Sequence, residues 1–267
     1  MRKAWNKISR VYQDRYNIKT GKIHYGPLCP SENSLNLLGP LKGKKVLELG
    51  SGACQNSIVM ALSGACVTSW DISREQLKHG AKIAKDSGAT IKTVEGSFLD
   101  FAKMDIIENF DLVLSVFALQ YCRDKKELDI VFKSVYNALT YGGSFVFSLD
   151  HPIRSHGSWQ NNYFVFDNYF DKSQKKWKYD FPESEVSVSM SGSYLIIQDY
   201  FDALTKNGFY VKQLLEPEPV KSDFNSNFGV KSRYGIKSKD DPFEYNNLSR
   251  VPGTIIFQSF KLPRENS

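Results

Sequence analysis

The segment VLELGSGACQNS at residues 46–57 combines a carboxylate with a glycine-rich turn. Gly50 and Gly52 let the backbone turn tightly and approach a ligand without interference from a Cβ atom. Asp71 follows Gly50 by 21 positions, and a carboxylate there can accept hydrogen bonds from both hydroxyls of a ribose. These residue types at this spacing predict a site for a ligand that contains a ribose.

The residues around the turn separate two classes of such a ligand. The dinucleotide fingerprint requires a third glycine at the position of Gln55, so that a helix can begin close to the pyrophosphate. Glu48 lies two positions before Gly50, and its carboxylate suits a ligand with an ammonium or sulfonium group and no phosphate. We therefore favour a cationic nucleoside ligand and keep a nicotinamide-dependent oxidoreductase as an alternative.

Two residues are candidates for a general base near this turn. Tyr121 and His151 each follow a predicted strand, and the carboxyl ends of parallel strands form the ligand crevice of an open α/β sheet. His151 precedes Pro152, which holds it in an extended conformation. A structural role is the alternative for this histidine, and a base is needed only if the substrate must lose a proton.

The elements that must position these residues alternate along the chain from Lys44 onward. The predicted strands lie at residues 45–50, 66–72, 90–96, 110–117, 144–150, 210–217 and 253–262. The intervening helices carry apolar residues at helical spacing, with Ser73 and Asp124 as N-caps. This order predicts an α/β fold with a doubly wound, mostly parallel, seven-stranded sheet, in which the final strand is antiparallel.

Three details of the helices can be checked. In the second core helix, Leu77, Ala81 and Ala84 are expected to share one face. The third is expected to include Leu139 and to end at the glycines of positions 142–143, before the fifth strand. A further helix is predicted within residues 194–208, and no long helix is evident between the last two strands.

Two segments do not follow the alternation, and they divide the predicted single domain into parts. Residues 1–43 form an N-terminal arm with a helix predicted from Ser31 to Leu38. Residues 44–151 form the cofactor-binding core, and residues 193–267 complete the sheet. Residues 152–192 are rich in aromatic and polar side chains, which predicts a β-ribbon or loop that covers a site as a lid.

Four motifs resemble those of class I S-adenosylmethionine-dependent methyltransferases over roughly residues 40–150. They are ELGSGA at 48–53, DIS at 71–73, EGSFLD at 95–100 and FDLVLSVFALQYCRD at 110–124. Cys54 stands where many members have a third glycine, and Ser97 stands where an aspartate that contacts adenine is common. HYGPLCPSE at 24–32 is similar to a segment of a bacterial small-molecule subgroup that helps to close the cofactor pocket.

The resemblance implies a Rossmann-like methyltransferase fold and S-adenosyl-L-methionine as cofactor, with S-adenosyl-L-homocysteine as product. It implies in-line transfer of the methyl group to a nitrogen or oxygen atom of a small metabolite or natural product. The residues that match the cofactor-binding motifs, or lie beside them, are Tyr25, Glu48, Gly50, Ser51, Gly52, Asn56, Asp71, Ile72, Gln76, Ser97, Phe98, Ser115, Val116 and Phe117.

Composition limits the partners. The net charge of +6 is spread along the chain, so it permits an RNA or protein substrate without indicating one, and nucleic acid is not the expected partner. The four cysteines are far apart, which predicts no metal site and suits a cytoplasmic protein. No stretch approaches the roughly 20 apolar residues that span a bilayer. A monomer or homodimer is expected, and a non-catalytic cofactor-binding protein remains an alternative.

Overall fold

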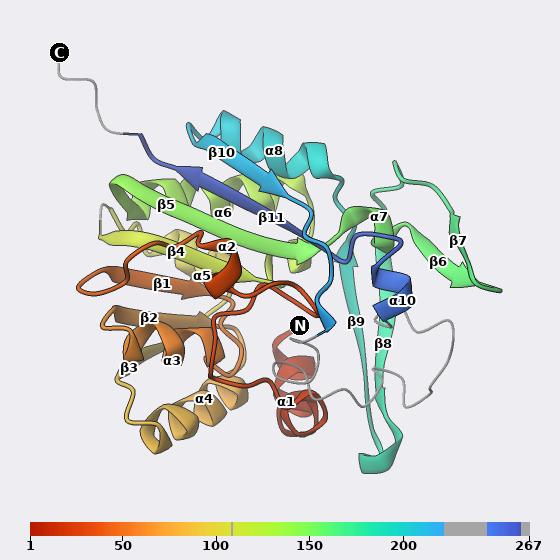
Figure 1. Cartoon of the computed structure of the whole chain (residues 1–267), viewed down its shortest axis with the longest axis horizontal. Helices are drawn as coiled ribbons and strands as arrows, with labels where there is room; N and C mark the ends of the chain where they lie inside the picture. Colours follow the sequence, from red (N-terminus) through yellow and green to blue (C-terminus); the bar gives the residue numbers. More distant parts are fainter. Residues whose placement is uncertain (108, 222–244, 263–267) are drawn as a thin grey trace.

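A seven-stranded sheet forms the centre of the computed structural model, which describes residues 1–107, 109–221 and 245–262 (Figure 1). Its strand order is β10-β11-β5-β4-β1-β2-β3. The strands are β1 (Lys45–Leu49), β2 (Cys66–Asp71), β3 (Ile91–Glu95), β4 (Phe110–Val116), β5 (Leu139–Asp150), β10 (Tyr210–Leu215) and β11 (Thr254–Phe260). Neighbours among β1–β5 are parallel, and β11 is antiparallel to both β5 and β10. The predicted doubly wound, mostly parallel sheet is confirmed.

Both faces of the sheet are buried, because successive side chains of a strand point to opposite faces. In β1, Leu47 and Val46 belong to two different core clusters. In β4, Val113 joins the first cluster and Leu112 the second, and all four side chains are at most 1% exposed. β4 therefore occupies the central position that its apolar sequence predicts.

The core helices are α3 (Gln55–Leu62), α4 (Arg74–Asp86), α5 (Phe98–Lys103), α6 (Lys125–Ala138) and α8 (Ile197–Lys206). Three of these five helices, α4, α5 and α6, begin at polar N-cap residues. Ser73 accepts a hydrogen bond from the Gln76 backbone N–H and Asp124 accepts one from the Glu127 N–H, so both predicted N-caps are present. Ser97 forms a reciprocal capping box at the start of α5.

Two helix details differ from the sequence analysis. The buried face of α4 contains Leu77, Gly80 and Ala84, whereas Ala81 is exposed. A Cβ atom at position 80 would lie 2.6 Å from the Cys54 Sγ atom. The helix α4 can therefore approach the glycine turn this closely only with a glycine at position 80. Leu139 begins β5 rather than ending α6, because it pairs with Phe110 of β4.

The N-terminal arm contains a helix that the sequence analysis missed, α1 (Arg2–Tyr16). The helix expected from Ser31 to Leu38 is shorter, α2 (Glu32–Leu35). It ends early because Asn36 adopts a left-handed conformation and the Glu32 carboxylate accepts the backbone N–H groups of Leu37 and Leu38. A carboxylate that holds these two donors takes the place of a further helical turn.

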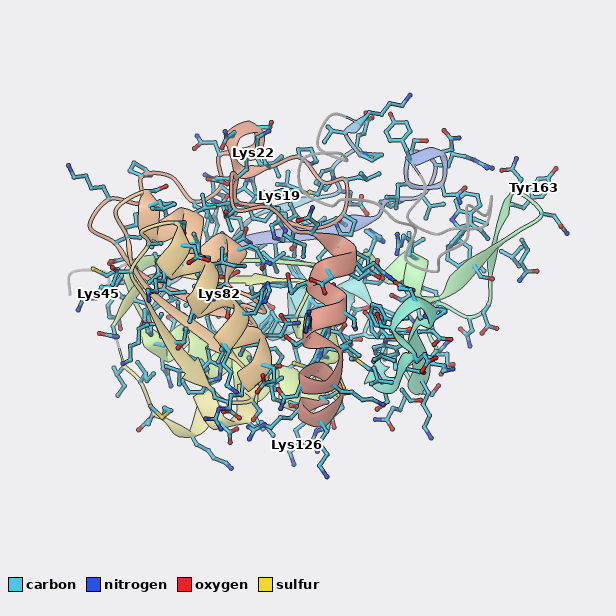
Figure 2. All side chains as sticks on the ribbon, turned by 90° about the horizontal axis from the view of Figure 1, so that it is seen from below. Lys19, Lys22, Lys45, Lys82, Lys126 and Tyr163 are labelled. Atoms are coloured by element: carbon cyan, nitrogen blue, oxygen red, sulfur yellow. The ribbon has the colours of Figure 1, made fainter. Side chains whose placement is uncertain are left out.

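The aromatic segment after β5 forms a short helix and two antiparallel ribbons, in agreement with the ribbon alternative. These elements are α7 (Pro152–Ser155), β6 (Gly157–Gln160) with β7 (Tyr163–Phe166), and β8 (Gln174–Phe181) with β9 (Val186–Ser193), joined by η2 (Pro182–Ser184). The β6–β7 ribbon projects from the molecule, with Tyr163 at its outer end (Figure 2). The β8–β9 ribbon lies beside α1 (Figure 1).

The connection from β10 to β11 runs through residues 222–244, which lie outside the described residues, and then through α10 (Tyr245–Leu248). The expectation for this connection therefore falls largely outside the described part of the chain. Among the residues that the structure describes, no helix has the length and apolar character required to cross a membrane.

Candidate active site

A cavity of about 380 Å³ lies at the carboxyl ends of β1, β2 and β4, next to α1. Ligands of open α/β sheets bind at this edge. The lining includes residues of the glycine turn, the ends of β2 and β4, the start of α5, the arm, and η1 (Leu119–Tyr121). It brings together residues that are far apart in the sequence.

The glycine turn has no room for a side chain at its first glycine, Gly50. Gly50 has φ 79°, and a Cβ atom there would overlap the Ala118 methyl group. The Gly50 and Ser51 backbone N–H groups donate to the Trp70 carbonyl, at 2.7 and 3.0 Å, which fixes the turn to β2. Glycine is therefore required at position 50 both by backbone conformation and by space.

Asp71 is held by backbone donors on both carboxylate oxygens. Its Oδ2 accepts from the Gly52 N–H at 2.8 Å, and its Oδ1 accepts from the Ser73 N–H at 2.7 Å. Burial raises the pKa of Asp71 to about 6, against the lowering effect of these hydrogen bonds. The side chain lines the cavity with acceptor capacity left, because a carboxylate offers about four lone-pair positions.

Glu48 is the second buried carboxylate of the cavity wall, and it is 3% exposed. Its Oε2 accepts from the Ser57 N–H at 2.9 Å and from the Ser57 hydroxyl, which in turn accepts from Ser69 at 2.7 Å. Burial nevertheless raises the pKa of Glu48 to about 7. A cation placed next to this group would favour its charged form and offset the cost of burial.

The arm is fastened to the cavity by side-chain amides. Gln13 of α1 donates to Gln76 Oε1 at 2.9 Å and accepts from Gln55 Nε2 at 2.7 Å. Asn56 forms both hydrogen bonds with the backbone N–H and carbonyl of His24, at 2.9 and 3.0 Å. Helix α1 and the segment after it are thereby held next to the starts of α3 and α4.

Aromatic side chains form the remaining wall. Trp5 and Tyr12 of α1 and Tyr121 of η1 line the cavity, and the Trp5 ring centroid lies 5.4 Å from that of Tyr12 and 5.8 Å from that of Tyr121. Figure 2 shows α1 between the helices of the N-terminal half of the sheet and the β8–β9 ribbon. Trp177 and Tyr179 of that ribbon pack behind these rings.

Most of the residues predicted for the site line the cavity. They are Glu48, Gly50, Ser51, Gly52, Asn56, Asp71, Ile72, Gln76, Ser97, Phe98, Val116 and Phe117, together with the candidate base Tyr121. Three predicted residues, Tyr25, Ser115 and His151, do not line it, although Tyr25 and Ser115 are next to lining residues in the sequence.

Each of these three side chains has another partner. The Tyr25 hydroxyl donates to Glu32, and the Ser115 hydroxyl donates to the Leu49 carbonyl at 2.7 Å. His151 is fully buried, with Nε2 at 2.7 Å from Glu216 Oε1 and Nδ1 accepting from the Ile153 N–H. The geometry therefore brings Tyr121 but not His151 to the cavity as a candidate base.

Further lining residues were not predicted from the sequence, and they come from α1, the segment after it, the glycine turn, the start of α5 and the surroundings of η1. They are Met1, Trp5, Tyr12, Gln13, Ile18, His24, Gly26, Pro27, Ala53, Gln55, Gly96, Leu99, Ala118, Arg123 and Glu127. Apolar residues at positions 5, 8 and 12 are spaced as on one helix face, which is the signal that predicts α1.

Comparisons with known proteins agree with this geometry. Residues 46–143 match a family described as a methyltransferase domain. The uncharacterized methyltransferase YbaJ of Bacillus subtilis is 35% identical over 114 residues, which are 43% of each chain. An uncharacterized protein of Haemophilus influenzae is 27% identical over 276 residues, covering 97% of this chain and 99% of its own length.

The fold gives the same result. A crystal structure described as an S-adenosylmethionine-dependent methyltransferase from Listeria monocytogenes superposes with a TM-score of 0.66 at 23% identity, covering 87% of this chain and 97% of that one. Residues 46–143 thus match a methyltransferase domain, and the chain has the Rossmann-like fold of S-adenosylmethionine-dependent methyltransferases. Both findings agree with the resemblance to class I S-adenosylmethionine-dependent methyltransferases that the motifs at 48–53 and 71–73 indicate.

Proposed function

We propose that this chain transfers a methyl group from S-adenosylmethionine to a nitrogen or oxygen atom of a small metabolite or natural product, within the cavity described above. One observation supports this most strongly: the buried carboxylates Glu48 and Asp71 share one cavity with an aromatic wall. The volume of about 380 Å³ lies within the 300–1,000 Å³ range typical of small-molecule sites.

The residues present fit an adenosyl group that carries an amino-acid tail. Asp71 uses one position on each oxygen for a backbone donor, which leaves acceptor positions for two ribose hydroxyls. The pKa of Glu48, which burial raises to about 7, indicates a carboxylate that a nearby cation would stabilise in its charged form. Ile72 and Phe98 offer apolar surface for a planar base.

Bound adenosylmethionine supplies an electrophilic methyl group. The lone pair of the acceptor atom forms the new bond to the methyl carbon, the sulfur keeps the electron pair of the bond that breaks, and the acceptor proton leaves to water. Because charge is dispersed during this displacement, alignment and exclusion of water supply most of the rate. Tyr121, at the aromatic wall, is placed to hydrogen-bond the acceptor atom.

The position of the arm favours a small acceptor over bulk RNA or protein. Helix α1 is held next to the glycine turn by Gln13, and Arg15 ties the same helix to the ribbon through Glu183. The β8–β9 ribbon of the aromatic insertion packs against α1 and so supports the arm that lines the cavity.

Transfer of label from methyl-tritiated adenosylmethionine tests the substrate class. We expect label to appear in the dialysable fraction of a metabolite extract, and to be lost when Asp71 is replaced by asparagine. Label that appears instead in RNA, and disappears after ribonuclease treatment, would contradict the proposal, as would label in protein. The exposed Asp86→Asn variant, with the same substitution on α4, is the matched control.

A further inference from the structure

The aromatic wall of the cavity is a continuous surface contributed by two elements. Trp5 and Tyr12 come from α1, and Tyr121 comes from η1. The Trp5 and Tyr121 rings meet edge to face at an interplanar angle of 87°, with centroids 5.8 Å apart. A flat molecule in contact with either ring would bury large apolar surface on both partners.

The wall is supported from behind and does not have to be assembled by a ligand. The Tyr179 ring centroid lies 6.0 Å from that of Trp5, and the Tyr179 hydroxyl lies 3.4 Å from the Tyr121 hydroxyl. Ile8 and Phe181, both fully buried, anchor α1 to the ribbon beneath these rings. Rings that are already held in place lose little conformational entropy when a ligand binds.

The lining holds more carboxylates than cationic side chains, and its arginine has a carboxylate partner. Among the lining residues that the structure describes, Arg123 supplies the one lysine or arginine side chain, and its Nε donates to Glu127 Oε2 at 2.6 Å. Burial lowers the pKa of His24 to about 4, so this lining histidine is neutral near pH 7. An anionic acceptor would enter without a cationic side chain that lacks a carboxylate partner.

A cationic acceptor meets a different obstacle. Aromatic faces attract cations, but the methyl donor carries a positive sulfonium in the same cavity, and two like charges at close range repel each other. An ammonium nitrogen also has no lone pair with which to attack. The remaining class is a molecule that is uncharged when it binds.

We infer that the acceptor is an uncharged planar molecule with a hydroxyl or amino group, which packs on Trp5 and Tyr121. The Tyr121 hydroxyl, which is paired with the Tyr179 hydroxyl, hydrogen-bonds the polar atom of the acceptor. This inference rests on the proposed function and names the substrate class of the same site. Tyr179 is a positioning residue in this arrangement, because it acts through the Tyr121 hydroxyl.

Three phenols with one ring and different charges test the inference: para-cresol, para-hydroxybenzoate and para-hydroxybenzylamine. Their binding is measured by isothermal titration calorimetry on the full chain saturated with adenosylhomocysteine. We expect para-cresol to bind at least about tenfold more tightly than the benzoate, because a buried carboxylate without a partner is costly. The amine should bind more weakly when adenosylmethionine replaces adenosylhomocysteine, whereas para-cresol should not.

Variants connect the result to the wall. Trp5→Leu should weaken para-cresol binding severalfold, whereas Phe170→Leu, the same kind of change at a residue that is 74% exposed and outside the lining, should leave it unchanged. Tyr179→Phe should raise the Kd for para-cresol severalfold and leave the Kd for toluene, which lacks the hydroxyl, unchanged. A structural defect would weaken both ligands equally.

Failure of the proposed function and failure of the inferred acceptor class give different results. If adenosylhomocysteine itself does not bind, the proposed function fails and the inference fails with it. If adenosylhomocysteine binds but the benzoate binds as tightly as para-cresol, or no phenol binds, the inference alone is overturned. Unchanged affinity for para-cresol in Trp5→Leu would also overturn it.

Discussion

Asp71 accepts the backbone N–H of Gly52 at 2.8 Å, so the carboxylate at the end of β2 and the glycine turn after β1 form one unit. The Ser73 N–H holds the other carboxylate oxygen, at 2.7 Å. The side chain is therefore oriented before any ligand arrives, and ligand binding does not have to order it. The two motifs that are most recognisable in the sequence depend on each other in the structure.

The first prediction concerns this carboxylate. Asp71→Asn removes the charge and places an amide NH₂ group against one of two backbone donors. We expect the Kd for adenosylhomocysteine to rise by about 10- to 150-fold, since hydrogen bonds to charged groups contribute about 1.5–3 kcal/mol. Isothermal titration calorimetry measures the change, with Asp86→Asn as control. An unchanged Kd would exclude Asp71 from the ligand site.

The second prediction concerns space at the glycine turn. Gly50→Ala should reduce the free energy of unfolding more than Gly88→Ala does. Both glycines have a positive φ, 79° and 72°, but a Cβ atom meets the Ala118 methyl group at position 50 and nothing within 4 Å at position 88. The strain common to both costs about 1 kcal/mol, and the overlap adds to it. Equal losses in urea denaturation would contradict the close approach.

The third prediction concerns pH. Burial raises the pKa of Glu48 from 4.5 to about 7, so the folded chain binds more protons than the unfolded chain between these values. The contribution of Glu48 to stability is therefore fully present below about pH 4.5 and is lost as pH rises through 7, with a slope of at most about 1.4 kcal/mol per pH unit.

Substitution isolates this contribution from those of the other carboxylates. The difference in unfolding free energy between Glu48→Gln and the unmodified, ligand-free chain should move in favour of the variant from pH 5 to pH 8. Denaturation curves at several pH values provide the measurement. A difference that does not depend on pH would show that the Glu48 pKa is close to its ordinary value.

The fourth prediction concerns the arm. Gln13→Ala leaves the amides of Gln55 and Gln76 without their partner on α1, and each buried unsatisfied group costs about 1–3 kcal/mol. We expect faster proteolysis of residues 1–20 and faster dissociation of adenosylhomocysteine. Gln160→Ala, at an exposed glutamine of β6, serves as the control. Unchanged proteolysis would show that Gln13 does not hold the arm.

The sheet and its glycine turn could be predicted because their signals are local. Within residues 46–52, a buried strand that carries a carboxylate leads directly into two glycines. The strand β2 likewise ends at a carboxylate, Asp71. Because parallel strands end at the same edge of a sheet, these residues come together independently of how the helices pack. Central burial of β4 followed from its apolar run in the same way.

The remaining features depend on contacts between distant parts of the chain. Side chains alternate along β4, so Val116 lines the cavity whereas Ser115 bonds to Leu49, and proximity in sequence could not separate them. His151 contacts Glu216, 65 positions away. Helix α1 was missed because the surface that buries Ile8 belongs to the β8–β9 ribbon, which follows it by more than 160 residues.

Hydrogen exchange on the full chain, with and without adenosylhomocysteine, tests the location of the ligand site most directly. We expect slower exchange in peptides that contain residues 48–57 and 71–76, and no change at residues 157–166 of the projecting ribbon. Protection confined to other segments, or no protection at saturating ligand, would contradict a cofactor site between the glycine turn and Asp71.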